Sequence, residues 1–181
     1  MSSVKKNTLP EGWEEKRFEE IIESHIIGLV RNVKQQSLDF SYEYVKMNNI
    51  TNDNYFTFDN ITCVEANEKE VNKFELNNGD FLFNTRNSFE LVGKSCIYDS
   101  DKKGVLYNNN LMRVRFMNMI NSYFILYQFS SPFLISQLYK IKSGTTNVCA
   151  IYYHSLKDVL LFIPPLEEQK RIVAKIDGLF A

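Results

Sequence analysis

The chain has 181 residues with 44% hydrophobic and 14% aromatic side chains, and its formal net charge is −1. This apolar content excludes a globally disordered protein, and at roughly 150 residues per domain the length excludes a multidomain motor or synthase. Because no apolar run approaches the ~20 residues of a membrane helix and the N-terminal stretch lacks an apolar signal sequence, we expect a folded, cytoplasmic protein.

The first third of the sequence predicts a turn, a long exposed loop and a strand. Residues 9–13, with the sequence LPEGW, favour a turn that leads into a short element. Residues 28–37 are polar and basic and lack periodicity, which indicates an exposed loop. Apolar and polar residues alternate over residues 40–50, as is typical of a strand.

The middle of the sequence is predicted to be rich in strands. Residues 77–80, with the sequence NNGD, are typical of a turn, and the apolar residues 81–83 predict a short strand directly after it. A polar cluster follows at residues 84–88. Residues 91–98 and 104–116 then predict two further strands, separated by a charged turn.

Two short helices and a final apolar run are predicted in the last third. Apolar residues recur at three-to-four spacing between Ser122 and Tyr139, and Pro132 interrupts them, which favours two helical pieces. Residues 143–147, with the sequence SGTTN, predict a small polar loop. The apolar run over residues 152–163 follows that loop.

A C-terminal helix is predicted to begin after Pro164 and Pro165. Proline suits the first turn of a helix, and Glu167 and Glu168 favour its positively polarised N-terminal end. Apolar positions then repeat as in a heptad, which is typical of a helix that packs against a partner helix. The alternative is a helix folded back on its own domain. The predicted helix-partner residues are Leu166, Gln169, Ile172, Val173, Ile176 and Phe180.

Basic residues are concentrated in one segment of this nearly neutral chain. Residues 84–157 hold nine Lys and Arg against three Asp and Glu, a net charge of +6, whereas the rest of the chain sums to −7. A basic segment of this kind favours a surface that faces phosphates. We therefore expect these cations to converge on one side of the domain. The alternative is that they are scattered over all faces.

Sequence patterns of catalysis and metal binding are weak or missing. The chain has no GxxxxGK[ST] or GxGxxG loop for nucleotides, and its three cysteines form no CxxC pair, so neither a zinc site nor a disulfide is expected. The triplets at residues 14–16 and 168–170, each Glu-x-Lys, are similar to those of nucleases that hold Mg²⁺ with carboxylates. Such triplets arise easily in a sequence rich in Glu and Lys. A stand-alone Mg-dependent nuclease is kept as an alternative.

Five segments resemble one protein family in the same order along the chain. They are residues 9–13 (LPEGW), 43–50 (EYVKMNNI), 76–86 (LNNGDFLFNTR), 143–147 (SGTTN) and 163–177 (IPPLEEQKRIVAKID). The chain resembles the target recognition domain of type I restriction–modification specificity subunits, and the PPLEEQ block behind the GTT loop is the most specific part. The resemblance implies an α+β fold, with a mixed, strand-rich target recognition domain over residues 1–163 and the start of a coiled-coil-like helical spacer over residues 164–181.

The resemblance also implies a DNA-binding function without catalysis in this chain. In that family, two such domains each read one half of a split double-stranded DNA target. A modification subunit transfers methyl groups from S-adenosylmethionine, and an ATP- and Mg-dependent restriction subunit cuts. We therefore expect a specificity module with no catalytic residue, metal or cofactor of its own. Its implied partners are these two subunits and either a second recognition domain or another copy, bound through the C-terminal helix. A structural adaptor without DNA affinity is the second alternative.

The candidate DNA-binding residues lie in polar loops. Arg86 suits a guanine edge or a phosphate and Asn87 an adenine edge, although Arg86 can instead tether its loop to a core carboxylate. The run at residues 140–147 suits phosphate contacts, with a helix end capped by Gly144 as the alternative. For residues 31–36, the alternative to DNA contact is a solvated loop. For Asn108–Asn110, the alternative to base reading is a plain turn. The candidates are Arg31, Lys34, Gln35, Arg86, Asn87, Ser88, Lys140, Lys142, Ser143, Gly144, Thr145, Thr146, Asn147, Tyr152 and His154.

Overall fold

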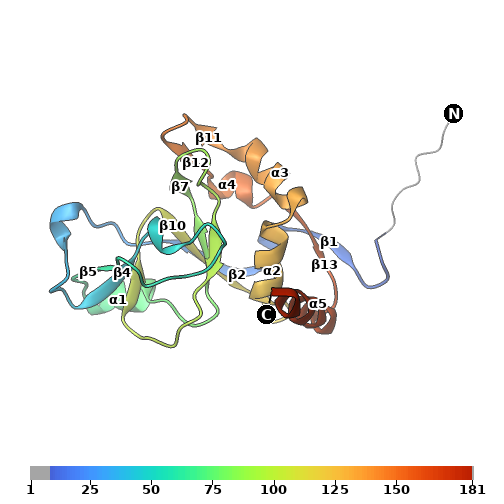
Figure 1. Ribbon diagram of the computed structural model, residues 1–181, viewed down its shortest axis with the longest axis horizontal. Helices are drawn as coiled ribbons and strands as arrows, with labels where there is room; N and C mark the ends of the chain where they lie inside the picture. Colours follow the sequence, from blue (N-terminus) through green and yellow to red (C-terminus); the bar gives the residue numbers. More distant parts are fainter. Residues whose placement is uncertain (1–8, 181) are drawn as a thin grey trace.

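A four-stranded antiparallel sheet lies at the centre of the computed structural model, which describes residues 9–180 (Figure 1). In spatial order its strands are β2 (Ile22–Ile27), β10 (Leu111–Phe116), β6 (Phe81–Asn84) and β8 (Ser95–Ile97). Every residue of β6 is buried because this inner strand is covered on both faces. The predicted turn before it is confirmed, since Asp80 N–H donates to the Asn77 carbonyl at 3.0 Å and Gly79 has a φ of 90°.

Helices enclose the main hydrophobic core together with this sheet. They are α2 (Ser122–Phe129), α3 (Pro132–Ile141) and the short α4 (Tyr153–Leu156). Phe129 of α2 packs edge-on against Phe81 and Phe83 of β6, with ring centroids 5.2 and 5.9 Å apart. The predicted break at Pro132 is confirmed, because this proline stands in the first turn of α3 and the Ser131 hydroxyl caps the same helix end.

A second four-stranded sheet has a separate core at the other end of the molecule. Its order is β3 (Gln36–Ser37), β5 (Thr62–Val64), β4 (Tyr42–Val45) and β9 (Val105–Tyr107). Strands β4 and β9 run parallel and the other pairs antiparallel, so the β-structure is mixed, as predicted. The core beneath includes Val45, Tyr98 and Tyr107, which are fully buried.

Helix α1 (Glu68–Phe74) packs beside strand β9 and is absent from the predicted elements. Its sequence, EKEVNKF, is mostly charged, so it gives no apolar periodicity. The sequence does hold a capping box. The Asn67 side chain accepts a hydrogen bond from the Glu70 N–H, and the Glu70 carboxylate accepts one from the Asn67 N–H, each at 3.0 Å.

Two smaller sheets complete the β-structure. One pairs β1 (Glu14–Arg17) with β13 (Leu160–Ile163), and the other joins β11 (Ser143–Gly144), β12 (Cys149–Ala150) and β7 (Arg86–Asn87). Short 3-10 helices occupy Phe18–Glu20, Val33–Gln35 and Met47–Asn49. Within residues 9–180, no helix has the length and apolar character needed to cross a bilayer.

Two glutamine side chains cover the second edge of strand β13. The Gln128 amide donates to the Phe162 carbonyl and accepts from the Phe162 N–H, and Gln137 does the same at Leu160, all at 2.8 to 3.1 Å. These amides take the place of a neighbouring strand, and they leave no open edge there for another chain.

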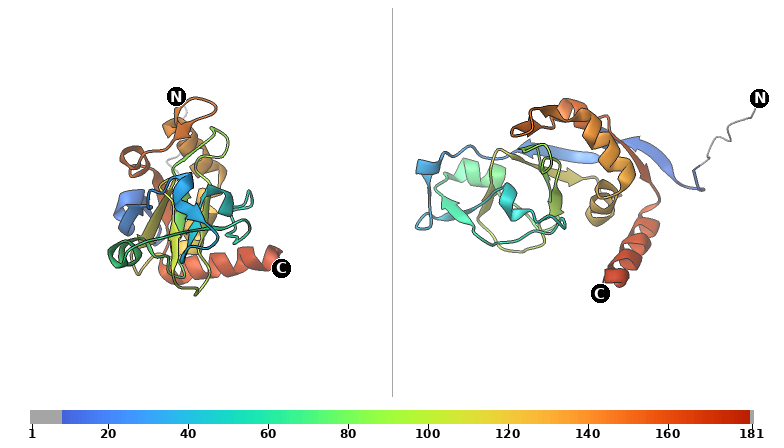
Figure 2. Two further views of the ribbon diagram at one scale, coloured as in Figure 1. Left: turned by 90° about the vertical axis from the view of Figure 1, so that its left-hand side faces the viewer. Right: turned by 45° about the horizontal axis from the view of Figure 1, so that its top comes forward.

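The C-terminal helix α5 (Leu166–Phe180) begins directly after the two prolines, as predicted, and contacts α2 (Figure 2). The fully buried Gln169 holds it in place. Its side-chain oxygen accepts from the Asn121 N–H at 2.8 Å, and its amide nitrogen donates to the carbonyls of Met119 and Pro164 at 3.0 and 2.9 Å. Both the oxygen and the nitrogen of this amide have hydrogen-bond partners inside the domain. The expectation that Gln169 faces a partner helix is therefore wrong.

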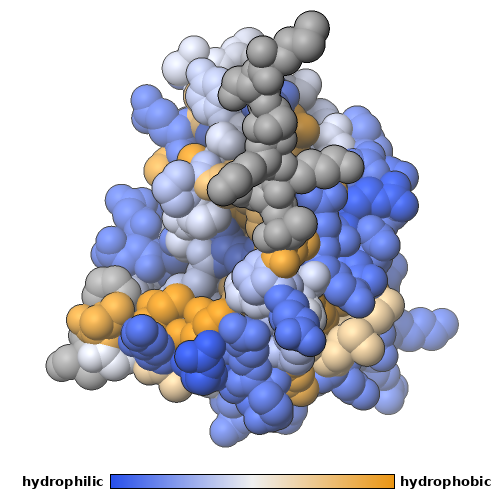
Figure 3. Space-filling model, turned by 90° about the vertical axis from the view of Figure 1, so that its right-hand side faces the viewer, coloured by the Kyte–Doolittle hydropathy of each residue, from blue (hydrophilic) through white to orange (hydrophobic). Residues whose placement is uncertain are grey.

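The other predicted helix-partner residues whose side chains are described are half-buried. Ile172 and Val173 are half-buried against the main core, which agrees with the alternative of a helix folded back on its own domain. Leu179 is 75% exposed, and a strip of apolar residues is visible on the side of the molecule where α5 lies (Figure 3). The side chain of Phe180 lies outside the described residues. Partner-helix contact through Leu166 and Ile176, both half-buried, stays a prediction.

Candidate nucleic-acid interface

The three-stranded sheet β11–β12–β7 brings together candidate residues from two distant segments of the chain (Figure 1). Arg86 pairs with Ala150 and Asn87 with Cys149 across one side of β12, while Gly144 pairs with Cys149 across the other. The polar cluster after β6 and the GTT loop therefore lie on one small sheet. The sequence separation of almost 60 residues gives no hint of this pairing.

The GTT loop is the tip of a tight hairpin between β11 and β12. Gly144 has a φ of 132°, and a Cβ at this position would lie 2.3 Å from the Val148 carbonyl oxygen, so only glycine fits. The Thr145 N–H closes the hairpin by donating to the same carbonyl at 2.9 Å. Helix α3 has already ended at Ile141, and Lys142 is extended. The alternative in which Gly144 caps a helix is therefore wrong.

The hairpin presents polar side chains to solvent and is anchored to the segment beside it. Ser143, Gly144, Thr145, Thr146 and Asn147 are all exposed. The Thr146 carbonyl accepts a hydrogen bond from the Phe89 N–H at 2.9 Å. The Lys142 ammonium donates to the Phe89 carbonyl and lies 4.7 Å from the centroid of that ring. The hairpin is thus held in one position while its tip stays free for a ligand.

Arg86 is exposed and its guanidinium has no carboxylate partner among residues 9–180. The alternative that Arg86 tethers its loop to a core carboxylate is therefore wrong. The neighbouring candidates are less free, since Asn87 and Ser88 are half-buried and the Asn87 side-chain oxygen accepts from the Ser88 N–H at 2.8 Å. Arg86 is the cation of this sheet that is best placed to bind an external acceptor.

A cavity of about 310 Å³ opens beside Arg86. Its wall is partly aromatic and partly polar, and it is formed by Ile27, Thr85, Arg86, Asn109, Ala150, Ile151, Tyr152 and Tyr153. Of the three asparagines considered as a plain turn, Asn108 is buried and Asn109 reaches this cavity. Sequence reasoning misses Ile27 as a site residue, because it comes from β2, far from Arg86 along the chain. Asn109 is considered for base reading but is not included among the candidates.

Two stacked aromatic pairs flank this cavity. The His25 ring lies on Tyr153 with centroids 3.6 Å apart, and Tyr152 stacks on His154 at 5.6 Å. Burial lowers the pKa of His25, so its imidazole is neutral at neutral pH and adds no charge to the site. Tyr152 and His154 are exposed, as their candidate role requires, whereas Tyr153 is half-buried.

The remaining candidates lie elsewhere. Lys140 is exposed near the end of α3, where it lines a cavity together with Asp158. Arg31, Lys34 and Gln35 lie by the second sheet. The Arg31 guanidinium donates to a Glu70 carboxylate oxygen at 2.8 Å and to the Glu65 carbonyl. Its side chain is only 14% exposed, so Arg31 ties its loop to α1 and is not free for DNA in the way we expected.

The basic residues of the central segment do not form one surface. Arg113 is buried and donates to the Glu75 carbonyl at 2.7 Å, and Arg115 makes a two-point contact with Asp80 at 2.6 and 3.0 Å. Lys102 pairs with Glu43 and Lys157 with Glu19. The expectation that all these cations converge on one side is wrong, because several of them neutralise acidic groups of the fold. Arg86 and Lys142 are the two that lie at the hairpin sheet.

Comparisons with known proteins give relatives of one kind. The family model described as the type I restriction modification DNA specificity domain matches residues 10–181. The putative type I restriction enzyme MjaX specificity subunit of Methanocaldococcus jannaschii is 32% identical over 171 residues, which cover 93% of this chain and 39% of that protein. The EcoKI specificity subunit of Escherichia coli is 30% identical over 123 residues, which cover 67% of this chain and 26% of that protein.

Solved structures show the same fold. The HsdS subunit of Thermoanaerobacter tengcongensis superposes with a TM-score of 0.68 at 21% identity, covering 97% of this chain and 39% of that one. A chain of a type I R-M system, studied for its complex assembly and conformational transition, superposes with a TM-score of 0.72 at 24% identity. The match covers 97% of this chain and 40% of that one. The α+β expectation is confirmed, and the chain spans less than half the length of these relatives. This chain belongs to the family of type I restriction modification DNA specificity domains.

Proposed function

We propose that this chain is a sequence-specific double-stranded DNA-binding domain of a type I restriction–modification specificity subunit. It reads one half of a bipartite target and performs no catalysis itself. A modification subunit that uses S-adenosylmethionine and a restriction subunit that uses ATP and Mg act at the sites it selects. Membership of the specificity-domain family supports this role.

The hairpin sheet is the observation that carries the proposal. It places the guanidinium of Arg86, which has no carboxylate partner among residues 9–180, within one small structure with the exposed GTT loop and a cavity lined by Asn109 and Tyr152. Arginine and asparagine side chains match the hydrogen-bonding edges of guanine and adenine, and loop N–H and hydroxyl groups bind phosphates. Cation, amide and loop donors are the three types of group that a base-reading surface needs.

The two alternatives find little support in the structure. Glu14 pairs with Lys16 at 2.8 Å and Glu168 with Arg171 at 3.2 Å, so each carboxylate already has a cationic neighbour. Over residues 9–180, no group of three or more His, Cys, Asp or Glu side chains is arranged to hold a metal ion. The matched relatives are specificity subunits and favour neither a nuclease nor an adaptor without DNA affinity.

Fluorescence anisotropy with labelled duplexes of random sequence tests the proposal. At low salt the protein is expected to bind duplex DNA, and binding should weaken as salt rises. Absence of binding at low salt, with a folded protein, would favour the adaptor. Mg-dependent cutting that is lost in Glu14→Ala or Glu168→Ala would favour the nuclease.

A further inference from the structure

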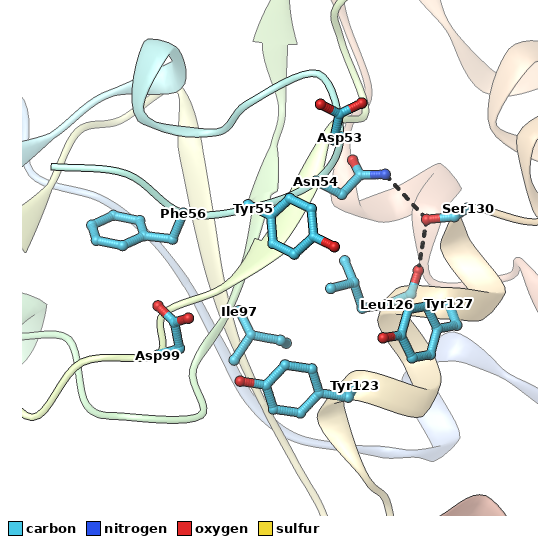
Figure 4. A pocket seen from close by; sticks show the side chains of 10 residues that line it. All are labelled: Asp53, Asn54, Tyr55, Phe56, Ile97, Asp99, Tyr123, Leu126, Tyr127 and Ser130. Atoms are coloured by element: carbon cyan, nitrogen blue, oxygen red, sulfur yellow. Dashed lines mark hydrogen bonds between the residues drawn. The ribbon is translucent and has the colours of Figure 1, made fainter. Parts of the chain in front are cut away.

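A cavity lined by tyrosines lies away from the hairpin sheet, between the loop after Ile50 and helix α2 (Figure 4). Tyr123 and Tyr127 come from α2, and Tyr55 faces them from the loop. The cavity measures about 80 Å³, whereas pockets for drug-sized ligands measure roughly 300 to 1,000 Å³. It has room for the head group of one side chain and not for a nucleoside.

Hydrogen bonds fix the loop that forms one wall of this cavity. The Thr51 N–H donates to the Tyr55 carbonyl at 2.9 Å, and the Thr51 hydroxyl accepts from the Tyr55 N–H at 3.0 Å. Asn54 has a φ of 65°, and its side-chain amide donates to the Ser130 hydroxyl at the end of α2 at 3.1 Å, as drawn in Figure 4. The loop is thereby attached to the opposite wall, and the cavity exists before any ligand binds.

The wall of this cavity is acidic as well as aromatic. Asp53 and Asp99 line it, and neither forms an ion pair with a residue in the described part of the chain. Asp177 of α5 lies just outside and accepts the hydroxyl hydrogen bond of Tyr127. Burial, followed by that hydrogen bond and the charge of Asp177, raises the pKa of Tyr127 to about 12. The phenol therefore stays neutral, and the local field is negative.

We propose that this cavity binds an arginine side chain presented by a protein partner. A planar guanidinium stacks on tyrosine faces and donates hydrogen bonds to carboxylates, so both features of the wall favour the same group. The carboxylates repel phosphates, so this surface serves a protein contact and not DNA. None of the residues that line this site belongs to the hairpin sheet, and the site does not depend on the DNA-binding proposal.

Titration of the ¹⁵N-labelled chain with L-argininamide tests this site, and amide chemical shifts are the measurement. L-citrulline amide, which has a similar shape but an uncharged ureido group in place of the guanidinium, is the control probe. The expected result is saturable shifts at Tyr55, Tyr123 and Tyr127 with argininamide and none with the citrulline compound. Equal shifts with both probes, or argininamide shifts confined to other regions, would overturn the proposal.

A pair of variants tests the role of the Asp99 carboxylate directly. Asp99→Asn removes a charge from the wall, and we expect it to weaken argininamide binding at least threefold. Asp101→Asn is the matched control, because Asp101 is exposed, lies outside the cavity and accepts only from the Asn78 amide among the described side chains. Thermal melts establish that both variants fold. Equal weakening by the two substitutions would contradict the site, whatever the outcome of DNA binding.

Discussion

Gln169 ties helix α5 to the domain through a single buried amide. Replacing it with leucine keeps the size but leaves the Asn121 N–H and the carbonyls of Met119 and Pro164 without partners. Each buried group left unsatisfied costs about 1 to 3 kcal/mol. We expect Gln169→Leu to lower the free energy of unfolding by roughly 2 to 4 kcal/mol after partial relaxation, measured by urea denaturation.

The neighbouring Lys170 supplies the control for that measurement. Its side chain is exposed and, within the described part of the chain, bonds only to Glu167, about one helical turn away on the same helix. Lys170→Ala should change stability by no more than about 0.5 kcal/mol, as is usual for surface substitutions. Similar losses in both variants would mean that α5 is not held through the Gln169 amide.

Arg86 is the residue whose loss should affect sequence discrimination most. Its guanidinium is exposed at the hairpin sheet, and a bidentate contact with a base is worth about 1 to 3 kcal/mol of discrimination. We expect Arg86→Ala to reduce the affinity ratio between a selected target and mismatched duplexes by this amount. Lys102→Ala should leave the ratio unchanged, because Lys102 is engaged by Glu43 at 2.6 Å. Equal effects of the two changes would remove Arg86 from the reading residues.

At the scale of elements, the β11–β12 hairpin depends on Gly144. The backbone there has a φ of 132°, and an added Cβ would meet the Val148 carbonyl oxygen at 2.3 Å. Gly144→Ala should therefore distort the hairpin and weaken DNA binding while the distant cores stay folded, as measured by anisotropy and circular dichroism. Gly79→Ala is the matched control, because Gly79 also has a positive φ but has open space around it. Unchanged DNA binding in Gly144→Ala would exclude the hairpin from the interface.

Helix α1 is attached to the loop before β3 by the Arg31–Glu70 ion pair. Hydrogen bonds from the Arg31 side chain, and then from the Asn67 N–H, lower the pKa of the Glu70 carboxyl. A carboxyl whose pKa is lowered in the folded state stabilises the fold at pH values above its unfolded-state pKa. This stabilisation disappears as the pH falls through the folded-state pKa. Between neutral pH and about pH 3, the wild type should lose more stability than Glu70→Gln. Equal losses of stability in the two proteins would contradict a stabilising role of the Arg31–Glu70 ion pair.

Elements with strong local patterns are the ones that sequence reasoning identifies. The strand at residues 81–83 and the helix pair around Pro132 are confirmed, since apolar runs and a proline are local signals. Helix α1 is missed because charged residues dominate it. The hairpin sheet joins Arg86 to Ala150 across more than 60 residues, and such pairings leave no local trace. For the same reason, the roles of Arg113 and Arg115 inside the fold were not predictable from their positive charge alone.

At the scale of the whole molecule, the net charge is only −1, and two cations, Arg86 and Lys142, lie at the hairpin sheet. If Lys142 contacts a phosphate, Lys142→Ala should reduce the slope of log affinity against log salt by about 1. The control is Lys103→Ala, because Lys103 donates to Asn77 in a different turn of the molecule. A salt slope that falls equally in both variants would show that binding is diffuse and not centred on the hairpin.

A binding selection from a pool of randomised duplexes tests the central claim most directly, because it requires both DNA affinity and base reading at one surface. The account predicts that the wild-type chain enriches a short, defined sequence. It also predicts that Arg86→Ala, although folded and still able to bind DNA at low salt, enriches that sequence much less. Recovery of unselected sequences by the folded wild-type protein would contradict the account.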